Sequence, residues 1–510
     1  MGTPETIVLR EETAEVEALI ERARVAQAAI ADYTQEQVDE LIKAMVWSCA
    51  QPGVAEELAQ QTLDETQLGD YNGKFAKISV RTRAALMDIL PDKSVGVIEE
   101  DVERNIVKIC KPVGVIGALS PSTNPEATPV IKSINALKGR NAIVIAPHPR
   151  AKFINMTIVE KMRCALETLG APADLVQTMA QPSLGKTEEL MKQCDFILAT
   201  GGPGMVKAAY SSGTPALGVG AGNAVITVDD TADLVDTAEK IRISKTLDLA
   251  ASCSADNSVV VFESVYDELL SNLIAEGGYV ASQGEADKIA AVLWHNGALN
   301  TAAVVKQPQV LAEMSGFSIP GDRKFIIVPY EGVGPDHPFS GEKLSAVMAF
   351  YKVADIHEAV AVTNAIQEYQ GMGHSCGIYS NSDENIITLA SGTKTSRVMV
   401  NQPQAASNSG NLWNGMRQTF SLGCGSWGGN STNENINWKH LVNITWVSKP
   451  LAQAKTLRSL QSNGVKLGRL SAEVEKARAA LKSQRRGVAP APPAADTDAA
   501  HMAALSAEAA

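Results

Sequence analysis

The sequence predicts an α/β protein whose first large region is a doubly wound parallel sheet. Short, uninterrupted apolar segments at Val113–Leu119, Ala142–Ala146 and Asp195–Thr200 alternate with segments of helical periodicity. Strands that are apolar at nearly every position are typical of parallel sheets, which helices cover on both faces. The composition agrees, because aromatic residues make up only 5% of 510 residues and glycine is abundant. Such a composition suits a helix-rich α/β fold better than an all-β fold.

Charge and cysteine content narrow the functional class. The formal net charge is -12, whereas a nucleic-acid-binding protein usually has a basic excess. The seven cysteines show no CxxC pair and no metal-ligand spacing, so they are expected to be reduced thiols of a cytosolic protein. The first 27 residues lack the basic start and apolar core of a signal peptide, and no apolar run has the length of a membrane span. We therefore expect a cytoplasmic protein.

The segments around this sheet also have regular patterns. Apolar residues recur at helical spacing between Thr13 and Ala50, which predicts amphipathic helices. The alternating run Ser94–Cys110 predicts a pair of strands. Residues 127–137 predict a helix between the first two apolar strands, and Ala224–Val228 predicts a further strand. A second α/β region follows at 245–430, with strands at Ser258–Phe262 and Lys324–Pro329 and helices at 266–275 and 285–293.

Cys253 is the candidate nucleophile. It lies in the loop Ala250–Ser258, whose small residues leave space around the sulfur just before an apolar strand. A thiolate attacks a carbonyl carbon when it lies in a partly open, electropositive site. The other six cysteines lie mainly beside bulky or apolar neighbours, and packing explains them adequately. A structural thiol is the alternative interpretation of Cys253, as it is for most single cysteines.

Asn124 is a candidate for stabilising negative charge on oxygen. It lies in the turn Ser120–Pro125, after the carboxyl end of the first parallel strand, where ligands of such sheets bind. A side-chain amide there donates to the oxyanion that forms when a thiolate adds to an aldehyde, a contribution of roughly 3–4 kcal/mol. An ordinary Asn-Pro turn is the alternative interpretation.

Two further segments are candidate sites for phosphate groups. Gly201–Gly204 lies between a strand and a helix, where backbone N–H groups of the first helical turn bind anions and Pro203 suits the first turn. His148 and Arg150 follow the strand Ala142–Ala146, where they could contact the ribose or phosphate of a dinucleotide. A solvated turn is the alternative for this pair. No set of His, Asp, Glu and Cys has the spacing of a metal site.

These motifs, taken together and in this order, resemble the aldehyde dehydrogenase superfamily in its CoA-acylating branch. The resemblance covers nearly all of residues 10–450 and rests on Gly114–Gly117 with Ser122–Pro125, Arg140–Lys152, Ala199–Tyr210, Gly218–Asn223, Ser252–Cys253, Pro338–Leu344 and Gly423–Asn430. The chain is similar to the aldehyde-oxidising half of the bifunctional alcohol/aldehyde dehydrogenases. The resemblance implies a doubly wound cofactor domain, an α/β catalytic domain and a small β oligomerisation element, in a homodimer or homotetramer.

The resemblance also implies a role for each matched residue. Cys253 matches the nucleophile, and Asn124 matches the amide that donates to the oxyanion. Glu342 matches the acid that holds the nicotinamide ribose in relatives. The other cofactor-binding residues that it implies are Ser122, Thr123, His148, Arg150, Gly201, Gly202, Gly204 and Gly220. No metal is implied.

Two departures from the family pattern concern the acyl acceptor and the cofactor. Val219 stands where hydrolytic members have the Glu that activates water, so the acyl-enzyme should persist until the thiol of coenzyme A arrives. Pro149, with His148 and Arg150 on either side, stands near the place of the carboxylate that is frequent in NAD-specific relatives. Either NAD or NADP is therefore expected, with coenzyme A as acceptor.

Several segments indicate the substrate within this branch. Gly373–Cys376, Val400–Gln402 and Trp438–Ile444 are most similar to enzymes that oxidise sulfoacetaldehyde, which implies a short aldehyde carrying a sulfonate. Arg417 is then the candidate cation for that anion. The alternatives are an acylating acetaldehyde or propionaldehyde dehydrogenase, including one from a bacterial microcompartment, a hydrolytic aldehyde dehydrogenase, and a non-catalytic scaffold or shell-associated protein on this fold.

The resemblance and the composition together predict the division of the chain. They predict a cofactor domain at 1–244, a catalytic domain at 245–430, a return segment with an oligomerisation strand at 431–450, a basic helical extension at 451–486, and a Pro/Ala linker with a terminal helix at 487–510. Met502 and Leu505 lie on one side of that terminal helix. A helix this short folds mainly on a partner, so the tail is either disordered or a segment that recruits the enzyme to a microcompartment shell protein.

Overall fold

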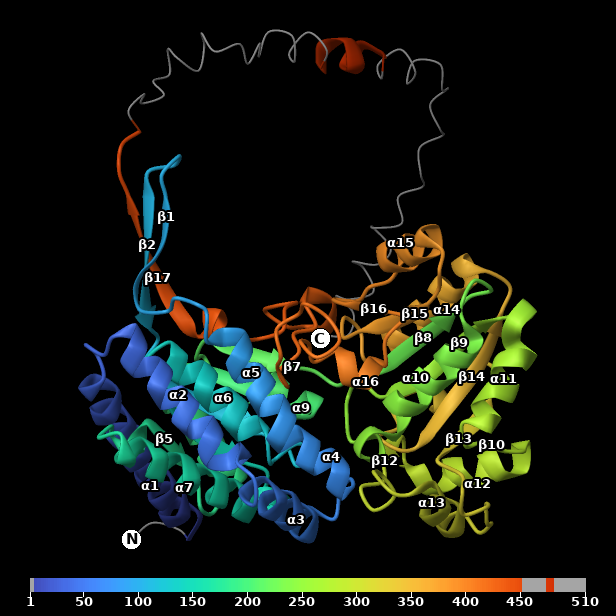
Figure 1. Ribbon diagram of the computed structural model, residues 1–510, viewed down its shortest axis with the longest axis horizontal. Helices are drawn as coiled ribbons and strands as arrows, with labels where there is room; N and C mark the ends of the chain where they lie inside the picture. The colour runs from blue at the N-terminus through green and yellow to red at the C-terminus, as the bar shows by residue number, and fades with distance from the viewer. Residues whose placement is uncertain (1–3, 452–473, 481–510) are drawn as a thin grey trace, which may run out of the picture. The chain divides into compact units, whose positions relative to one another are not determined.

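The computed structural model describes residues 4–451 and 474–480, with side-chain surroundings from residue 11 onward (Figure 1). One compact unit contains the described residues up to 100 together with 107–447. A second, small unit contains 101–106 and the described residues from 448 onward. The candidate site residues all belong to the first unit.

A series of helices precedes the first strand. They are α1 (Pro4–Ala29), α2 (Gln35–Ala50), α3 (Val54–Thr66), α4 (Tyr71–Ala76), the π-helix Lys77–Arg81 and α5 (Thr82–Ile89). Helix α2 begins at a capping box formed by Thr34 and Gln37 and buries its apolar face, so the predicted amphipathic helices are confirmed. The π-helix interrupts an otherwise continuous helical stretch, and such widened turns are frequent at functional sites.

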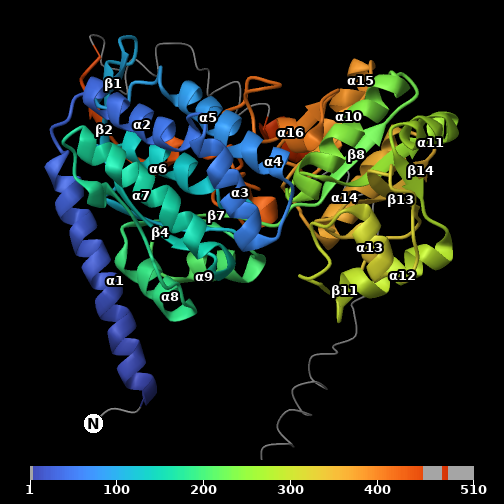
Figure 2. The same ribbon diagram turned by 60° about the horizontal axis from the view of Figure 1, so that its bottom comes forward.

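The first large sheet has five strands in the order β5-β4-β3-β6-β7. They are β3 (Val115–Ser120), β4 (Ala142–Pro147), β5 (Val176–Thr178), β6 (Phe196–Thr200) and β7 (Ala216–Val219), and every pairing is parallel. The helices between them are α6 (Thr128–Lys138), α7 (Lys152–Thr168), α8 (Leu184–Gln193) and α9 (Pro203–Ser211). Helices α6 and α7 pack together with α2, whereas α1 packs with α8, so helices cover both faces (Figure 2). The predicted doubly wound sheet is confirmed.

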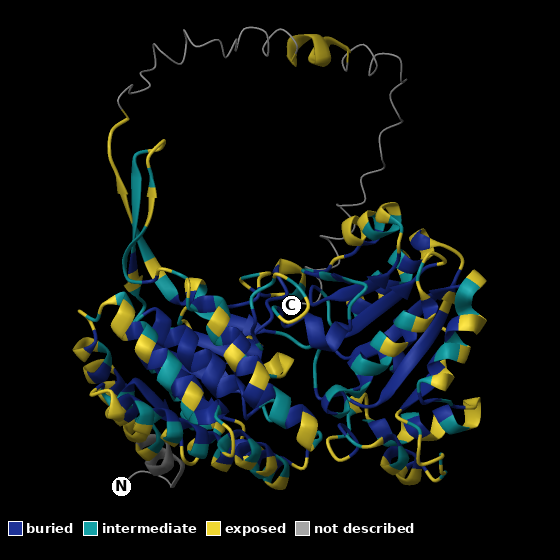
Figure 3. Cartoon of the chain, in the orientation of Figure 1, coloured by how far each residue is buried: buried dark blue, intermediate teal, exposed yellow. Residues whose placement is uncertain are grey.

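The second large sheet has seven strands in the order β10-β13-β14-β9-β8-β15-β16. They are β8 (Ala224–Val228), β9 (Asp256–Phe262), β10 (Gly278–Val280), β13 (Phe325–Pro329), β14 (Val347–Val353), β15 (Cys376–Tyr379) and β16 (Val398–Val400), all paired in parallel. Its helices are α10 (Leu234–Thr246), α11 (Tyr266–Ala275), α12 (Gln283–Leu293), α13 (Pro308–Met314), α14 (Ile356–Tyr369), α15 (Asp383–Gly392) and α16 (Gln404–Ser407). Separate apolar clusters fill its two faces, and Figure 3 shows the strands of both sheets buried.

The two sheets divide the chain earlier than the expected boundary at residue 244. Strand β8 pairs with β9 and β15, so residues 224–228 belong to the second sheet. The division between the sheets therefore lies between the end of β7 at Val219 and Ala224. A strand that is apolar at every position has the same sequence pattern in either sheet, because the pattern reports burial and not the pairing partner.

Smaller elements complete the described chain. Strands β1 (Gly96–Asp101), β2 (Ile106–Pro112) and β17 (Val442–Ser448) form a three-stranded sheet in that order, which confirms the strand pair predicted at 94–110. Strands β11 (Trp294–His295) and β12 (Ala298–Leu299) form a short antiparallel pair. Residues 474–480 are helical, whereas the rest of the basic extension and the predicted linker and terminal helix lie outside the described residues. In the described part of the chain, no helix combines the length and apolar character needed to cross a membrane.

Candidate active site

Cys253 lies on a loop whose approach has an unusual backbone. The loop connects the short 3-10 turn Leu247–Ala250 to β9, and Asp248, Leu249 and Ala250 have φ angles of 51°, 52° and 62°. Left-handed conformations of non-glycine residues cost roughly 1–3 kcal/mol each and persist only where surrounding contacts enforce them. The contacts here converge on the Asp248 carboxylate.

Asp248 is fixed by three donors from the α4 region. Its side chain accepts hydrogen bonds from the backbone N–H of Asp70 at 2.9 Å and from Lys74 Nζ at 2.8 Å. Lys77 Nζ donates to the same carboxylate oxygen as Lys74. Asp248 and Lys74 are fully buried. The ion pair therefore joins the strained turn before Cys253 to the helix that precedes the first sheet.

Cys253 and Asn124 line one cavity of about 160 Å³. Its other lining residues are Gly73, Ala76, Lys77, Val80, Arg81, Leu247, Ser252, Ser254, Ala405, Ser409, Leu412, Phe420 and Leu422. The structure thus brings together the two residues that the sequence analysis assigned to attack and oxyanion binding. The Asn124 amide donates to Thr123 Oγ1 at 3.3 Å. The volume is below the roughly 300–1,000 Å³ of pockets for drug-sized ligands, so the cavity suits a short substrate.

His374 faces the sulfur of Cys253. Its Nε2 lies 3.2 Å from Cys253 Sγ, and its Nδ1 lies 2.8 Å from Ser375 Oγ. Burial lowers the pKa of His374 to about 3, and the cation of Arg397 adds to that effect. Burial raises the pKa of Cys253 to about 12, with a further contribution from the carboxylate of Glu342. The pair is therefore a neutral thiol beside a neutral imidazole. Transfer of the thiol proton to Nε2 is unfavourable on its own, so it must occur together with attack on a carbonyl.

No sequence pattern predicts a role for His374. The segment Gly373–Cys376 carries only a resemblance to relatives. His374 lies 121 positions from Cys253 along the chain, and no local pattern links the two. The signal that was present is a histidine between a glycine and a serine directly before the strand β15, which is too common to single out one residue.

Glu342 lies near Cys253 but is not in the same cavity lining. It follows the 3-10 turn Pro338–Ser340 and is partly buried, and its backbone N–H donates to Gln370 Oε1 at 2.9 Å. Burial raises the pKa of Glu342 to about 8, although a hydrogen bond from the Gly222 backbone and the cation of Lys343 oppose the shift. Protonated or ionised, the carboxyl group retains acceptor oxygens that suit ribose hydroxyls.

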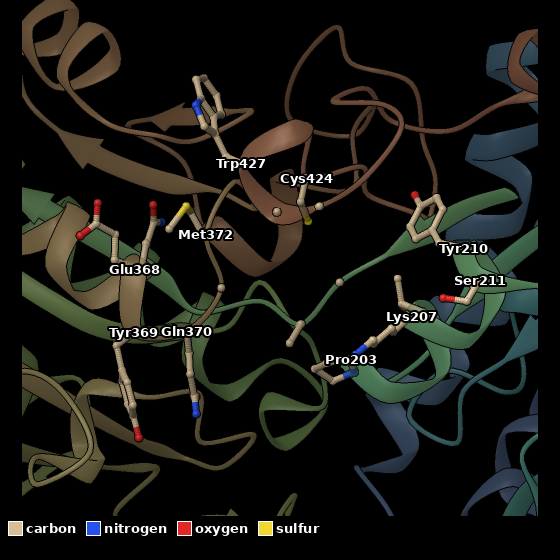
Figure 4. A pocket seen from close by; sticks show the side chains of 17 residues that line it. Pro203, Lys207, Tyr210, Ser211, Glu368, Tyr369, Gln370, Met372, Cys424 and Trp427 are labelled. Carbon is tan, nitrogen blue, oxygen red and sulfur yellow. The ribbon is translucent and has the colours of Figure 1, made fainter. Parts of the chain in front are cut away.

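A larger groove of about 510 Å³ adjoins this region (Figure 4). Figure 4 shows Pro203 and Lys207 of α9 on one side and Tyr369 and Gln370 on the other, with Cys424 between them. Gly220 also lines the groove. The groove is therefore bounded by α9 of the first sheet and by the end of α14 of the second sheet.

The first turn of α9 meets the requirements of a phosphate site. Gly202 is the N-cap and has no side-chain capping bond, so the first backbone N–H groups are not satisfied by a cap. A Cβ atom placed on Gly202 or Gly204 would meet nothing within 4 Å, whereas one on Gly201 would contact Met205 at 3.5 Å. The open space fits the pyrophosphate of a dinucleotide, to which the Gly204 N–H can donate, whereas the Met205 and Val206 N–H groups already donate to the Gly202 carbonyl.

The remaining predicted cofactor residues follow neighbouring strands. Ser122 and Thr123 follow β3, and His148 and Arg150 follow β4, while Gly201–Gly204 follows β6. Because β4, β3 and β6 are adjacent and parallel, their carboxyl ends lie along one edge of the sheet. His148 and Arg150 are exposed, and neither is among the residues that line the groove. Among the residues that the structure describes, no cluster of His, Cys, Asp or Glu could hold a metal ion.

Arg417 lies apart from the cavity of Cys253. Its NH2 group pairs with Asp92 Oδ1 at 2.9 Å, and Arg417 is not among the cavity-lining residues. Lys77 and Arg81 are the cations that line the cavity instead. The placement of Arg417 could not be read from its sequence, because residues 408–419, which follow α16, form an irregular segment whose path depends on contacts with distant residues.

Comparisons with known proteins agree with this fold. The model of the aldehyde dehydrogenase family matches residues 6–310. A sulfoacetaldehyde dehydrogenase of an Acholeplasma species is 44% identical over 84% of this chain and 90% of its own length. An acylating sulfoacetaldehyde dehydrogenase of Bilophila wadsworthia is 41% identical over 85% of this chain and 94% of its own length.

A solved structure is also similar. The crystal structure of an acetylating aldehyde dehydrogenase from Geobacillus thermoglucosidasius has a TM-score of 0.85 and 35% identity, covering 88% of this chain and 99% of its own. The family model spans the first large sheet and the first strands of the second, and the relatives and the solved structure match most of the chain. The chain therefore belongs to the aldehyde dehydrogenase family.

Proposed function

We propose that this protein is a CoA-acylating aldehyde dehydrogenase that oxidises a short aldehyde through a thioester on Cys253, with sulfoacetaldehyde as the favoured substrate. The observation that carries the proposal is the 3.2 Å approach of His374 Nε2 to Cys253 Sγ. This pair lies at a cavity that Asn124 also lines. A nucleophile, a base and an oxyanion donor are the groups that attack on an aldehyde requires.

The residues support a consistent first half-reaction. His374 takes the proton of the Cys253 thiol while the sulfur attacks the carbonyl carbon, and the Asn124 amide donates to the developing oxyanion. A nicotinamide dinucleotide held at this site would supply the hydride acceptor needed for the thioester to form. The first turn of α9 would hold the pyrophosphate, and Glu342 would hold the nicotinamide ribose. His148 and Arg150 would lie near the ribose or phosphate of the dinucleotide, and they are compatible with NAD as well as with NADP.

The second half-reaction transfers the acyl group. Val219 is buried at the end of β7 and has no group that can take a proton from water. Once His374 has released the first proton to solvent, it can accept the proton of an incoming thiol that attacks the Cys253 thioester, and it can return that proton to the departing Cys253 sulfur. Coenzyme A is therefore the acyl acceptor in this proposal, and the names of the acylating and acetylating relatives support it.

The substrate proposal rests on the relatives and on the cavity. Two of them are named for sulfoacetaldehyde, and a cavity of about 160 Å³ suits a short aldehyde. An assay of the purified protein with sulfoacetaldehyde, acetaldehyde and propionaldehyde tests it, with NAD or NADP and with or without coenzyme A. Acyl-CoA formation that requires coenzyme A is the expected result. Free acid formed equally well without coenzyme A would show a hydrolytic enzyme instead.

We propose a homodimer or homotetramer as the working assembly. Trp446 of β17 is 59% exposed, and Lys108 of β2 stacks over its ring at 4.6 Å. An exposed tryptophan on a small sheet favours contact with a second copy of the chain. Light scattering after gel filtration measures the assembly. A monomeric mass at micromolar concentration would contradict the proposal.

A further inference from the structure

Arg81 is a buried cation at the cavity of Cys253. It is the last residue of the π-helix Lys77–Arg81 and is only 9% exposed. Its NH1 group donates to Gln418 Oε1 at 3.1 Å, and its NH2 group donates to the Ala406 carbonyl at 2.7 Å. Both partners are uncharged. Within residues 11–451 and 474–480, no carboxylate forms an ion pair with Arg81.

The charge of Arg81 is therefore not balanced by the protein around it. Burial lowers its pKa to about 10, and no neighbouring acid raises it back. The group still carries a full positive charge at neutral pH, because that pKa lies well above 7. Removing a charge from water without a counter-charge is unfavourable. A ligand that brings a negative charge would remove this penalty.

The other lining cation is already neutralised. Lys77 donates to Asp248, which also accepts from Lys74. The nearby acid Asp88 accepts hydrogen bonds from the Asn411 side chain and the Gln418 backbone, both at 2.6 Å. Arg81 is thus the cavity-lining charge, among the described residues, that has no acidic partner.

The π-helix determines which residues reach the cavity. Gly73, Ala76, Lys77, Val80 and Arg81 all line it, so one face of the segment from α4 to the π-helix forms a wall. The rest of the lining includes the apolar residues Leu247, Leu412, Phe420 and Leu422, together with Ser252, Ser254 and Ser409. A short substrate therefore meets Cys253 and Asn124 in a cavity that has apolar sides and one unpaired cation.

We propose that Arg81 is the specificity-determining residue of the enzyme and binds the anionic end of a short aldehyde. The ligand class is an aldehyde with a terminal sulfonate or carboxylate, held by charge-assisted hydrogen bonds from the guanidinium. This inference rests on the proposed function, because it places the anionic end of the same substrate whose carbonyl meets Cys253. It assigns to Arg81 the role that the sequence analysis gave to Arg417.

Substrate discrimination by Arg81→Met tests the proposal. The ratio of kcat/KM for sulfoacetaldehyde to kcat/KM for propionaldehyde is measured in the wild type and the variant. Succinate semialdehyde is measured in the same way, as an aldehyde that carries a carboxylate. Loss of a buried charged hydrogen bond lowers the rate for anionic aldehydes by about 10²-fold. Propionaldehyde turnover changes by less than about threefold, since a neutral aldehyde makes no charged contact. Arg81→Lys retains part of the preference, because it keeps the charge without the planar fork.

Arg417→Met is the matched control. It removes an arginine whose charge Asp92 already balances, so the ratio of the two rate constants stays at the wild-type value. A collapsed ratio in Arg417→Met together with an unchanged ratio in Arg81→Met would overturn the proposal in favour of Arg417. An equal loss for all aldehydes in a folded Arg81→Met protein would also overturn it, because that result indicates a structural role.

A binding measurement separates this inference from the proposed function. The probe is 2-hydroxyethanesulfonate, the unreactive alcohol related to sulfoacetaldehyde, with 1-propanol as neutral control. It raises the thermal midpoint of wild type and not that of Arg81→Met. An enzyme that binds this probe through Arg81 but makes no acyl-CoA would refute the proposed function alone. Equal stabilisation of both proteins by the probe would refute the role of Arg81 alone.

Discussion

Lys74 and Asp248 form a fully buried ion pair, with Nζ 2.8 Å from Oδ2, beneath the loop that carries Cys253. The pair is 174 residues apart in sequence and links helix α4 to the turn before β9. Asp248 also has a left-handed backbone, as do Leu249 and Ala250. The ion pair thus holds in place a strained turn that would otherwise relax, and it fixes the position from which the Cys253 sulfur points into the cavity.

Asp248→Asn should destabilise the protein strongly. The change leaves Lys74 and Lys77 buried without a counter-charge, and removing one partner of a buried pair costs about 3–5 kcal/mol. Urea-induced unfolding followed by tryptophan fluorescence measures the loss. Asp236→Asn is the matched control, because Asp236 pairs with Lys240 at a partly exposed position, and ion pairs near the surface contribute about 1 kcal/mol or less. Equal unfolding midpoints for the two variants would show that the buried pair does not hold the turn.

Cys253→Ala should abolish aldehyde oxidation while leaving the fold and dinucleotide binding nearly intact. The sulfur is the only part of the side chain that the substitution removes, and the loop already consists of small residues. Turnover is measured with coenzyme A, and dinucleotide binding is measured by calorimetry. Cys164→Ala is the control, because Cys164 is an exposed thiol of α7. Substantial turnover in Cys253→Ala would remove Cys253 as the nucleophile.

Asn124→Ala should lower kcat by about 10²–10³-fold, as expected for loss of one oxyanion donor. The substitution removes an amide that lines the cavity of Cys253, and it keeps the backbone carbonyl of residue 124 that accepts a hydrogen bond from the Thr128 N–H. Steady-state kinetics at several aldehyde concentrations measures kcat and KM separately. A higher KM at unchanged kcat would instead assign Asn124 to ground-state substrate binding.

Alkylation of Cys253 in the enzyme without substrate should accelerate steadily with pH. Burial raises the pKa of Cys253 to about 12 and lowers that of His374 to about 3, so the neutral pair predominates at pH 7. Below its pKa the thiolate fraction rises about tenfold per pH unit. The rate of iodoacetamide labelling of the Cys253 peptide, followed by mass spectrometry between pH 6 and pH 9, measures this. A rate that stays constant over that range would indicate a preformed thiolate–imidazolium pair.

The sequence predicted the elements of the fold well, because burial on both faces and helical spacing appear directly in the residue pattern. The strands at Val113–Leu119 and Ala142–Ala146 and the helix between them agree with β3, β4 and α6 within about two residues. Strand β8 precedes the expected boundary at residue 244 but pairs in the second sheet, because an apolar strand does not encode its partner.

Within the site, sequence patterns found residues on the local loops Ser120–Pro125 and Ala250–Ser258, and the structure places Asn124 and Cys253 at one cavity. They could not find His374, Arg81 or Asp248, whose contacts join segments more than a hundred residues apart. The motif resemblance predicted that Glu342 holds the nicotinamide ribose. Only the fold shows where Glu342 lies relative to Cys253. Whether a charged side chain has an oppositely charged partner depends on its neighbours in three dimensions. No sequence pattern therefore indicates that Arg417 pairs with Asp92.

Val219→Glu should raise the share of free acid relative to acyl-CoA. Val219 ends β7, and Gly220 and Ala221 directly after it line the groove beside Cys424. The same segment then packs Gly222 against the Cys253 backbone. A carboxylate introduced at the start of this segment gains a pKa raised by burial, which suits it to take a proton from a water molecule near the thioester.

Val219→Gln is the matched control for that variant. It has nearly the same shape and no base, so acyl-CoA remains its main product while any effect of disturbed packing is retained. Both products are quantified by chromatography after turnover with limiting coenzyme A, and circular dichroism verifies that each variant is folded. An unchanged ratio of products in a folded Val219→Glu protein would show that position 219 does not face the thioester. The preference for coenzyme A would then have to come from exclusion of water at the groove rather than from the missing carboxylate.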